Sequence, residues 1–275
     1  MSVRSSPRRI TSRQNPVVAR VRDLVRVGSA SSAVLEGLSL IREAASARWP
    51  IELIAVTERT AEDPDVRALM NDLPAEVDRV ITTGPVMAAL SPARTASGCL
   101  AVVGITPATL DAAVAAASPQ LVVCPVNVQD PGNVGAIIRV AEAAGATAVL
   151  VCGTSADPFG WKALRGSMGS AFRLPVVPRV SIESALAATS KAGCRLVAAM
   201  LSGDAPDQMP LTGPVALFVG AEGQGLPDDV LSACDGRIAV PMTPPVESLN
   251  VAVATGIMLY EARRQRNAHA IRTLR

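Results

Sequence analysis

The sequence predicts an α/β protein built from two domains. Helix-type and strand-type segments alternate along both halves of the chain. The strand-type segments of the second half are continuous apolar runs, which are typical of a parallel sheet buried on both faces. Between the halves, residues 104–119 are rich in Ala, Thr and Pro and carry one charge. We therefore predict domains at 1–106 and 120–275, joined by 107–119 as a linker or a loosely packed helix.

The first domain is predicted to open with a helix. Asn15 is a good N-cap residue and Pro16 suits the first helical position, so the helix covers 17–27. Alternating strands and helices follow and form a single α/β layer. The strands are expected at 33–37, 51–56, 77–81 and 99–104, and the helices at 38–48, 62–72 and 84–90.

The second domain is predicted to alternate in the same way around a buried parallel sheet. Its strands are expected at 121–126, 147–152, 174–178, 195–200, 214–220 and 237–242. Its helices are expected at 133–145, 181–192, 226–234 and 249–266.

Composition argues against several classes of protein. No apolar run reaches the ~18 residues of a membrane span, and residues 1–26 lack the apolar core of a secretory signal, so we expect a cytoplasmic protein. The five Cys form no C-x-x-C pair and His269 is the single His. Zinc ribbons, a disulfide framework and His-based catalytic or metal sites are therefore not expected.

The charge is unevenly distributed along the chain. Residues 1–26 carry +6 and residues 261–275 carry +4, so the remaining 234 residues sum to −8. Basic ends on an acidic body indicate a polyanion partner, although solvated tails are also often basic. Arg outnumbers Lys 24 to 2. This suits phosphate contacts, but in so Ala-rich a chain it also fits a bias of genome composition. The chain has six aromatic residues, so base stacking on aromatic rings cannot be the main mode of nucleic-acid binding.

Three loops follow predicted strands at their carboxyl ends, where open α/β sheets bind ligands. The first is NVQDPGNVG, at 127–135. Asn133 stands where the helix begins and suits an N-cap. Arg139 lies about 9 Å further along the axis and is the lone charge of GAIIRVA. It is either an ion-pair partner or a functional group.

The second loop, GAEGQGLP at 220–227, has three glycines in six residues, with Glu222 among them. It matches neither G-x-G-x-x-G nor a P-loop, and its carboxylate suits a cation or a ribose hydroxyl better than a phosphate. A plain loop geometry is the alternative. In the third loop, at 241–250, Ser248 suits a helix N-cap and Asn250 then falls inside the first turn. Both side chains can still converge on one ligand.

Together these loops resemble the three signature motifs of the SpoU/TrmH family of RNA ribose 2′-O-methyltransferases. The matching stretches are DPGNVGAIIRVAEAAGA, VGAEGQGLP and VPM…ESLNVAVATGIMLYE, in the same order and spacing, together with LRGSMGSAFRLPV. The resemblance covers about 120–265. In the first domain TSRQNPVVARVRDL, VLEGLSLIREA and SPARTASGCLAVV are similar, with lower specificity, to the family's L30e-like substrate-binding domain.

The resemblance implies a trefoil-knotted SPOUT methyltransferase domain behind an N-terminal L30e-like α/β domain. It implies S-adenosylmethionine as cofactor, no metal, and a homodimer in which the last helix contributes an interface. The implied catalytic residues are Asn133, Arg139, Glu222, Ser248 and Asn250. The implied cofactor-binding backbone positions are Gly220, Val240 and Leu249. The chain departs from the family pattern at Pro244, where many members have Gly, and at Ser97, where Gln is common.

The expected function is therefore methylation of a ribose 2′-hydroxyl in structured RNA. An N-terminal domain of over 100 residues favours rRNA over tRNA as the substrate. Because Arg stays protonated, we expect Arg139 to bind and polarise the 2′-oxygen or a phosphate, with Glu222 orienting it. The alternatives are a non-catalytic RNA-binding homologue, a resistance methylase of the thiostrepton type and a Rossmann-type nucleotide enzyme, the last disfavoured by the missing G-x-G-x-x-G.

Overall fold

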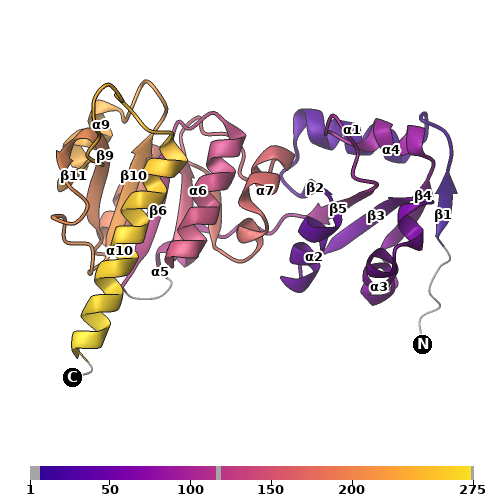
Figure 1. Ribbon diagram of the computed structural model, residues 1–275, viewed down its shortest axis with the longest axis horizontal. Helices are drawn as coiled ribbons and strands as arrows, with labels where there is room; N and C mark the ends of the chain where they lie inside the picture. The colour runs from indigo at the N-terminus through magenta and orange to yellow at the C-terminus, as the bar shows by residue number, and fades with distance from the viewer. Residues whose placement is uncertain (1–6, 116–118, 274–275) are drawn as a thin grey trace. The chain divides into compact units, whose positions relative to one another are not determined.

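The computed structural model describes residues 7–115 and 119–273, and the chain divides into two compact units (Figure 1). Unit 1 comprises Met1–Thr106 and Phe159–Phe172, and unit 2 comprises Pro107–Pro158 and Arg173–Arg275. The units are therefore not the two contiguous stretches expected, since 159–172 belongs with the N-terminal part. Arg4 and Arg275, two of the cations counted at the chain ends, lie outside the described residues.

Unit 1 is built on a five-stranded mixed sheet in the order β1-β4-β3-β5-β2. β1, β4 and β3 run parallel, whereas β5 is antiparallel to both β3 and β2. The strands are β1 Arg8–Ile10, β2 Ser32–Glu36, β3 Ile51–Thr57, β4 Asp78–Thr82 and β5 Cys99–Gly104. Four of them match the predicted strands, and β1 was not predicted.

Helices cover both faces of this sheet (Figure 1). α1 and α4 lie together on one face, and α2 and α3 lie on the other. Asn15 caps α1 as predicted, because its Oδ1 accepts from the Val17 N–H at 3.0 Å. The helices are α1 Pro16–Val27, α2 Leu38–Ser46, α3 Pro64–Asp72 and α4 Gly84–Leu90, with a 3₁₀ turn, η1, at Thr60–Glu62.

From Arg8 onward, the basic N-terminal segment is part of this fold and not a free arm. β1 pairs with β4 along Arg8–Ile10, and Ile10 is buried in the core. Arg8 Nε donates to Asp78 Oδ1 at 2.8 Å, and Arg9 forms an ion pair with Glu58. The carboxylates of unit 1 therefore already neutralise part of the basic charge near the N-terminus.

A later segment of the chain, Phe159–Phe172, also belongs to unit 1. α7 (Trp161–Ser167) and the 3₁₀ turn η2 (Ser170–Phe172) belong to it, and α7 packs beside β2. The Trp49 ring meets the Phe172 ring edge-on at 4.9 Å, and Trp49 Nε1 donates to the Phe172 carbonyl at 3.2 Å. Gly169 passes so close to α2 that a Cβ there would lie 2.8 Å from the Glu43 Cβ.

Unit 2 contains the predicted parallel sheet, with six strands in the order β11-β9-β10-β6-β7-β8. Every pairing in this sheet is parallel. The strands are β6 Leu121–Val126, β7 Ala148–Cys152, β8 Val176–Val180, β9 Arg195–Asp204, β10 Val215–Gly220 and β11 Gly236–Ile238. β11 is shorter than predicted, so residues 239–242 are free to form a loop.

Two helical layers sandwich this sheet. α6 and α10 lie side by side (Figure 1). α5, α8 and α9 contribute buried residues to a core on the opposite face. The helices are α5 Leu110–Ala115, α6 Pro131–Ala144, α8 Ile182–Lys191, α9 Asp228–Ala233 and α10 Val251–Thr273. α5 fills part of the 107–119 segment, and its residues Ala113 and Val114 are buried in the core, so this part is a packed helix instead of a linker or a loosely packed helix. Residues 116–118 lie outside the described part.

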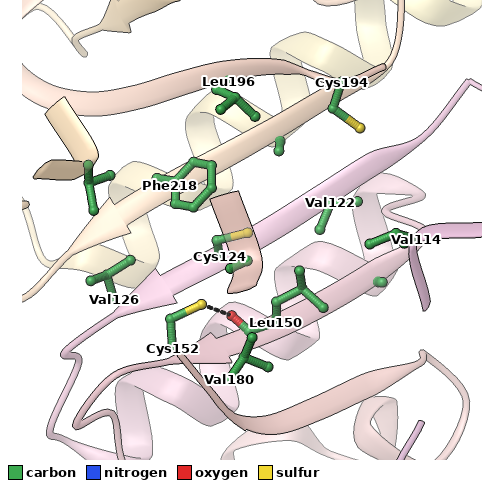
Figure 2. Close-up of a cluster of buried hydrophobic side chains, with 14 of the residues drawn as sticks. Val114, Val122, Cys124, Val126, Leu150, Cys152, Val180, Cys194, Leu196 and Phe218 are labelled. Carbon is green, nitrogen blue, oxygen red and sulfur yellow. Dashed lines mark hydrogen bonds between the residues drawn. The ribbon is translucent and has the colours of Figure 1, made fainter. Parts of the chain in front are cut away.

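Figure 2 shows how alternate strand residues fill this core, with Phe218 beside Cys124 and Val126. Cys124, Cys152 and Cys194 are small apolar fillers here, and all five cysteines of the chain are free thiols. Burial raises the pKa of the Cys124 thiol well above its ordinary value and that of Cys99, in unit 1, to about 12. The Cys124 and Cys99 thiols therefore stay protonated at neutral pH and are poor nucleophiles.

Two cations near the C-terminus, Arg264 and Arg266, also bind groups of their own unit. Arg266 Nε donates to the Leu211 carbonyl at 3.0 Å, and its two terminal nitrogens reach the carbonyls of Pro119, Gln120 and Gly213. Burial lowers the pKa of Arg266. Arg264 pairs with Glu261. Arg266 thus fastens α10 to the rest of unit 2, whereas the Arg264–Glu261 pair lies within α10 itself, so neither cation is left free for a polyanion.

Arg79 is the corresponding buried cation of unit 1, with 6% of its surface exposed. Its guanidinium donates to the carbonyls of Met70, Leu73, Pro74, Ala75 and Val77 at 2.7–3.5 Å. It thereby satisfies the end of α3 and the turn into β4, whose carbonyls would otherwise be buried without donors.

We expect Arg79→Met to lower the free energy of unfolding of unit 1 by about 2–4 kcal/mol, because several buried carbonyls lose their donor. Both tryptophans, Trp49 and Trp161, lie in unit 1, so thermal unfolding followed by tryptophan fluorescence reports on this unit. Arg67→Met is the control, since exposed Arg67 makes one bond to a carbonyl. Equal melting temperatures for the two variants would contradict the role assigned to Arg79.

Candidate functional site

The candidate site lies at the carboxyl edge of the unit 2 sheet. β6 and β10 are neighbours there, with Gly220 paired with Val126 at their ends. The loops that follow these strands, 127–130 and 221–227, therefore leave the sheet side by side. This is the edge at which α/β sheets place ligands.

Asn133 sits at the start of α6, but it is not the N-cap we expected. Asp130 is the cap: its Oδ1 accepts from the Asn133 N–H at 2.9 Å, and Pro131 occupies the first helical position. The Asn133 side chain is therefore not needed for capping. It instead donates from Nδ2 to Glu222 Oε1 at 3.0 Å.

Asn250, and not Ser248, caps α10. Its Oδ1 accepts from the N–H groups of Ala252 at 3.0 Å and Val253 at 3.3 Å. This fixes which end of the amide is oxygen, because only an acceptor can bind two helix N–H groups. The Asn250 Nδ2 group therefore has to find acceptors on the other side.

Those acceptors are Glu222 Oε1 and Asn133 Oδ1, each 2.9 Å from Asn250 Nδ2. Glu222 Oε1 also lies 3.5 Å from the Val251 N–H at the beginning of α10, where the helix dipole favours an anion. Asn133, Glu222 and Asn250 thus form a closed triangle of hydrogen bonds. Each comes from a different one of the three loops singled out in the sequence.

The turn that carries Glu222 needs glycine for packing reasons. A Cβ on Gly220 would lie 2.2 Å from the carbonyl carbon of Gly225, so the main chain folds back on itself without room for a side chain. The Gly225 N–H closes the turn on the Ala221 carbonyl at 2.9 Å. The result is a tight loop that presents Glu222 at its tip.

A polar pocket of about 170 Å³ opens beside the triangle. The second Glu222 oxygen, Oε2, makes no hydrogen bond with any described residue. The pocket is lined by Asn127, Val128, Gln129, Asp130, Asn133, Ala221, Glu222 and Gln224. Sequence reasoning did not assign Asn127, Gln129, Asp130 or Gln224 to the site, although their positions directly after strands were a usable signal.

Asn127 has a clear positioning role in this pocket. It adopts a left-handed backbone conformation, with φ 57°, directly after β6. Its Oδ1 accepts from the Thr154 N–H at 2.9 Å and from Thr154 Oγ1 at 3.1 Å. The loop after β6 is thereby tied to the loop after β7, which holds one wall of the pocket in place.

The structure does not bring Arg139 or Ser248 into the triangle. Arg139 follows Asn133 by six residues on α6, or about 240° around the helix, so the two share no face. Its exposed guanidinium has neither a hydrogen bond nor an ion pair within residues 7–115 and 119–273. Glu222 therefore does not orient Arg139 in the isolated chain, contrary to the expectation, because Arg139 points to another side of α6 from Asn133. Ser248 is exposed beside the triangle.

The backbone positions implied for cofactor binding flank the same edge. Gly220 ends β10, while Val240 and Leu249 lie in the loop after β11, both half-buried. Among the described residues, no group of three His, Cys, Asp or Glu side chains is placed to hold a metal ion. No helix in the described part of the chain is long and apolar enough to cross a membrane.

Comparison with known proteins matches this geometry to one family. The model of the SpoU rRNA Methylase family matches residues 120–260. An uncharacterized tRNA/rRNA methyltransferase of Synechocystis sp., slr1673, is 32% identical over 263 residues, 93% of each chain. The 23S rRNA (guanosine(2553)-2′-O)-methyltransferase RlmP of Bacillus subtilis is 42% identical over 137 residues, 50% of this chain and 55% of RlmP.

A solved structure extends the likeness to nearly the whole chain. The AdoMet-bound rRNA methyltransferase from Sinorhizobium meliloti has a TM-score of 0.82 at 29% identity, and the match covers 94% of this chain and 97% of that one. The chain spans about half the length of several curated relatives that it matches, RlmP among them. From the matched motifs and the full-length relative, the chain belongs to the SpoU rRNA Methylase family.

Proposed function

We propose that this protein methylates a ribose 2′-hydroxyl in structured RNA, with S-adenosylmethionine as methyl donor and rRNA favoured over tRNA. The observation that carries the proposal is the convergence of Asn133, Glu222 and Asn250 beside a polar pocket. The rRNA preference is supported by the N-terminal unit, which the rRNA methyltransferase of Sinorhizobium meliloti shares over its length.

The residues at the sheet edge fit the cofactor. When bound, S-adenosylmethionine supplies a methyl group carried on a positively charged sulfur. The main chain at Gly220, Val240 and Leu249 would hold it, because Gly220 ends β10 and the other two lie in the loop after β11, at the edge of the sheet where ligands bind. The Glu222 carboxylate provides negative charge nearby. The AdoMet-bound Sinorhizobium meliloti structure supports S-adenosylmethionine as the cofactor.

The difficult part of the reaction is to make the ribose 2′-oxygen nucleophilic. Glu222 Oε2 is available to accept a hydrogen bond from the 2′-hydroxyl and to take its proton. Asn133 and Asn250 hold Glu222 still, so the carboxylate is oriented before substrate arrives. Ser248, exposed at the same edge, helps to hold the ribose.

Arg139 keeps the role expected from the sequence, but Glu222 does not orient it. We assign its guanidinium to a phosphate or to the 2′-oxygen of bound RNA. Arg139 is exposed on α6 and has no ion pair among the described residues, so it can meet such a group without first breaking one. The substrate, and not the free protein, then orients it.

A homodimer through α10 forms part of the proposal. Val253, Ile257 and Tyr260 are spaced by four and three residues, so they share one face, and they are 52%, 41% and 70% exposed. Three exposed apolar side chains in a row favour a partner surface. Met258 and Leu259, on the same helix, are buried within unit 2 and are not part of this exposed face. The trefoil knot of the family is likewise proposed from the resemblance.

The main alternative is a homologue that binds RNA without catalysis. The complete hydrogen-bonded triangle favours the enzyme, since a binding protein has no need for it. Mapping of 2′-O-methyl groups in rRNA and tRNA from a strain lacking the protein tests the proposal. Loss of one mark supports it and names the nucleotide. Unchanged marks in both RNAs, together with no calorimetric binding of S-adenosylmethionine, would support the binding protein.

We expect Asn250→Asp to lower the methylation rate by about 100-fold or more while the protein stays folded. Aspartate caps α10 as well as asparagine does, but it replaces the donor facing Glu222 by a second carboxylate. Activity is measured by transfer of labelled methyl to rRNA, and folding by thermal unfolding. Asn250→Ala is the control for capping, and it should lose both stability and activity. Full activity in Asn250→Asp would contradict the positioning role of the amide.

We expect Arg139→Ala to lose at least ten-fold in methylation, with unchanged stability and unchanged binding of S-adenosylmethionine. The side chain is exposed and unpaired among the described residues, so its removal breaks no internal bond. Arg139→Lys should fail as well, because the planar two-point contact is lost. If Arg139→Ala kept more than a tenth of the activity, the residue would have no part in the reaction.

We expect Ile257→Glu to dissociate the proposed dimer without unfolding unit 2, because this side chain is exposed in the single chain. Analytical ultracentrifugation reads the change. Val27→Glu, at a 74% exposed position of unit 1, is the matched control and should leave the dimer intact. A wild-type protein that sediments as a monomer of 28.3 kDa and still methylates RNA would refute the dimer.

A further inference from the structure

The two helical layers of unit 1 carry opposite net charges. On the α1 and α4 side, residues 11–28 and 84–98 hold five Arg and one Asp, a net +4. On the α2 and α3 side, residues 38–48 and 60–76 hold three Arg and six carboxylates, a net −3. A domain polarised across its own sheet attracts a polyanion to one face and repels it from the other.

Three cations of the positive side lack a carboxylate partner among the described residues. Arg20 pairs with Glu52 and Arg26 pairs with Asp23, so these two are neutralised. The cations without such a partner are Arg13, Arg22 and Arg94, and all three are exposed.

Arg13 and Arg22 are held in place by α4. Arg13 Nε donates to the Pro85 carbonyl at 3.2 Å, and Arg22 Nε donates to the Ala89 carbonyl at 2.9 Å. These carbonyls are four residues apart, about one helical turn, so the two guanidinium groups flank one short helix. The terminal nitrogens of both groups make no bond within the described residues and can each receive phosphate oxygens. Anchored guanidinium groups lose less entropy when they bind.

Arg94 lies in the loop 91–98, which is held by hydrogen bonds to the Glu36 carboxylate. Glu36 Oε1 accepts from Ser91 Oγ at 2.8 Å and from the Ser97 N–H at 2.9 Å, which fastens both ends of the loop 91–98. The Glu36 carboxylate lies beneath the loop, with its other oxygen buried. The surface therefore presents the Arg94 cation and not the Glu36 anion.

We propose that RNA docks on unit 1 through the face formed by α1, α4 and the loop 91–98, with Arg13, Arg22 and Arg94 on phosphate oxygens. The α2 and α3 face remains free of RNA. This inference rests on the proposed function and adds to it the surface that holds the substrate. Contacts of this kind fix the orientation of the RNA and carry no base specificity.

The test measures the salt dependence of RNA binding. The probe is deproteinised bacterial large-subunit rRNA, titrated by the full-length protein at several NaCl concentrations. In R13Q/R22Q/R94Q the slope of log Kd against log salt should fall by about 2–3, since three phosphate contacts are lost. The matched control is R42Q/R48Q/R67Q, which removes the same charge from the opposite face and should leave the slope nearly unchanged.

A second variant, Arg94→Gln, separates the loss of a phosphate contact from damage to the fold. Arg94 makes no hydrogen bond to a described residue, so Arg94→Gln cannot disturb α4, and it should lower the slope by about 0.7–0.9. Tryptophan fluorescence and binding of S-adenosylmethionine check both units of every variant.

An unchanged slope in R13Q/R22Q/R94Q and in Arg94→Gln would overturn the proposed surface. So would an equal fall in the control, which would show an effect of net charge alone. If wild-type protein methylates rRNA but these variants bind it normally, the proposed surface fails and the proposed function stands. If wild-type protein neither binds nor methylates rRNA or tRNA, the proposed function fails with it.

Discussion

One carboxylate oxygen organises the candidate site. Glu222 Oε1 accepts from Asn133 and Asn250 and lies near the first N–H of α10, so it joins the loop after β10 to the starts of two helices. Those helices, α6 and α10, also pack against each other. The triangle is therefore continuous with the packing of unit 2. Its geometry is set when the protein folds, before any ligand is present.

Arginine performs three different tasks in this chain, and its frequency alone does not separate them. Arg79 and Arg266 are buried and satisfy main-chain carbonyls. Arg8 and Arg9 pair with carboxylates and hold the first strand. Arg13, Arg22, Arg94 and Arg139 keep terminal donors available at the surface. The guanidinium group suits all three tasks because its five donors can be shared between carbonyls, carboxylates and phosphates.

The alternation of elements could be predicted from sequence because its signals are local. The Asn15-Pro16 start of α1, the continuous apolar strands of unit 2 and the three loops at strand ends all lie where expected. The choice between competing caps could not be predicted. Asp130 and Asn133 both suit an N-cap, as do Ser248 and Asn250, and tertiary bonds to Glu222 decide between them. β1 has three residues, too few for a periodic pattern. The position of Arg139 depends on helix rotation, which spacing from a motif does not reveal.

The return of Phe159–Phe172 to unit 1 has a consequence for biosynthesis. The Trp49 ring packs against Phe159 and Phe172, which are synthesised more than 100 residues later. β6, α6 and β7 of the other unit are synthesised in between. The N-terminal unit therefore cannot complete its packing on the ribosome until residue 172 has left the exit tunnel. A fragment ending at residue 106 would expose the indole ring to water. The two units are thus interleaved in the order in which their residues are synthesised.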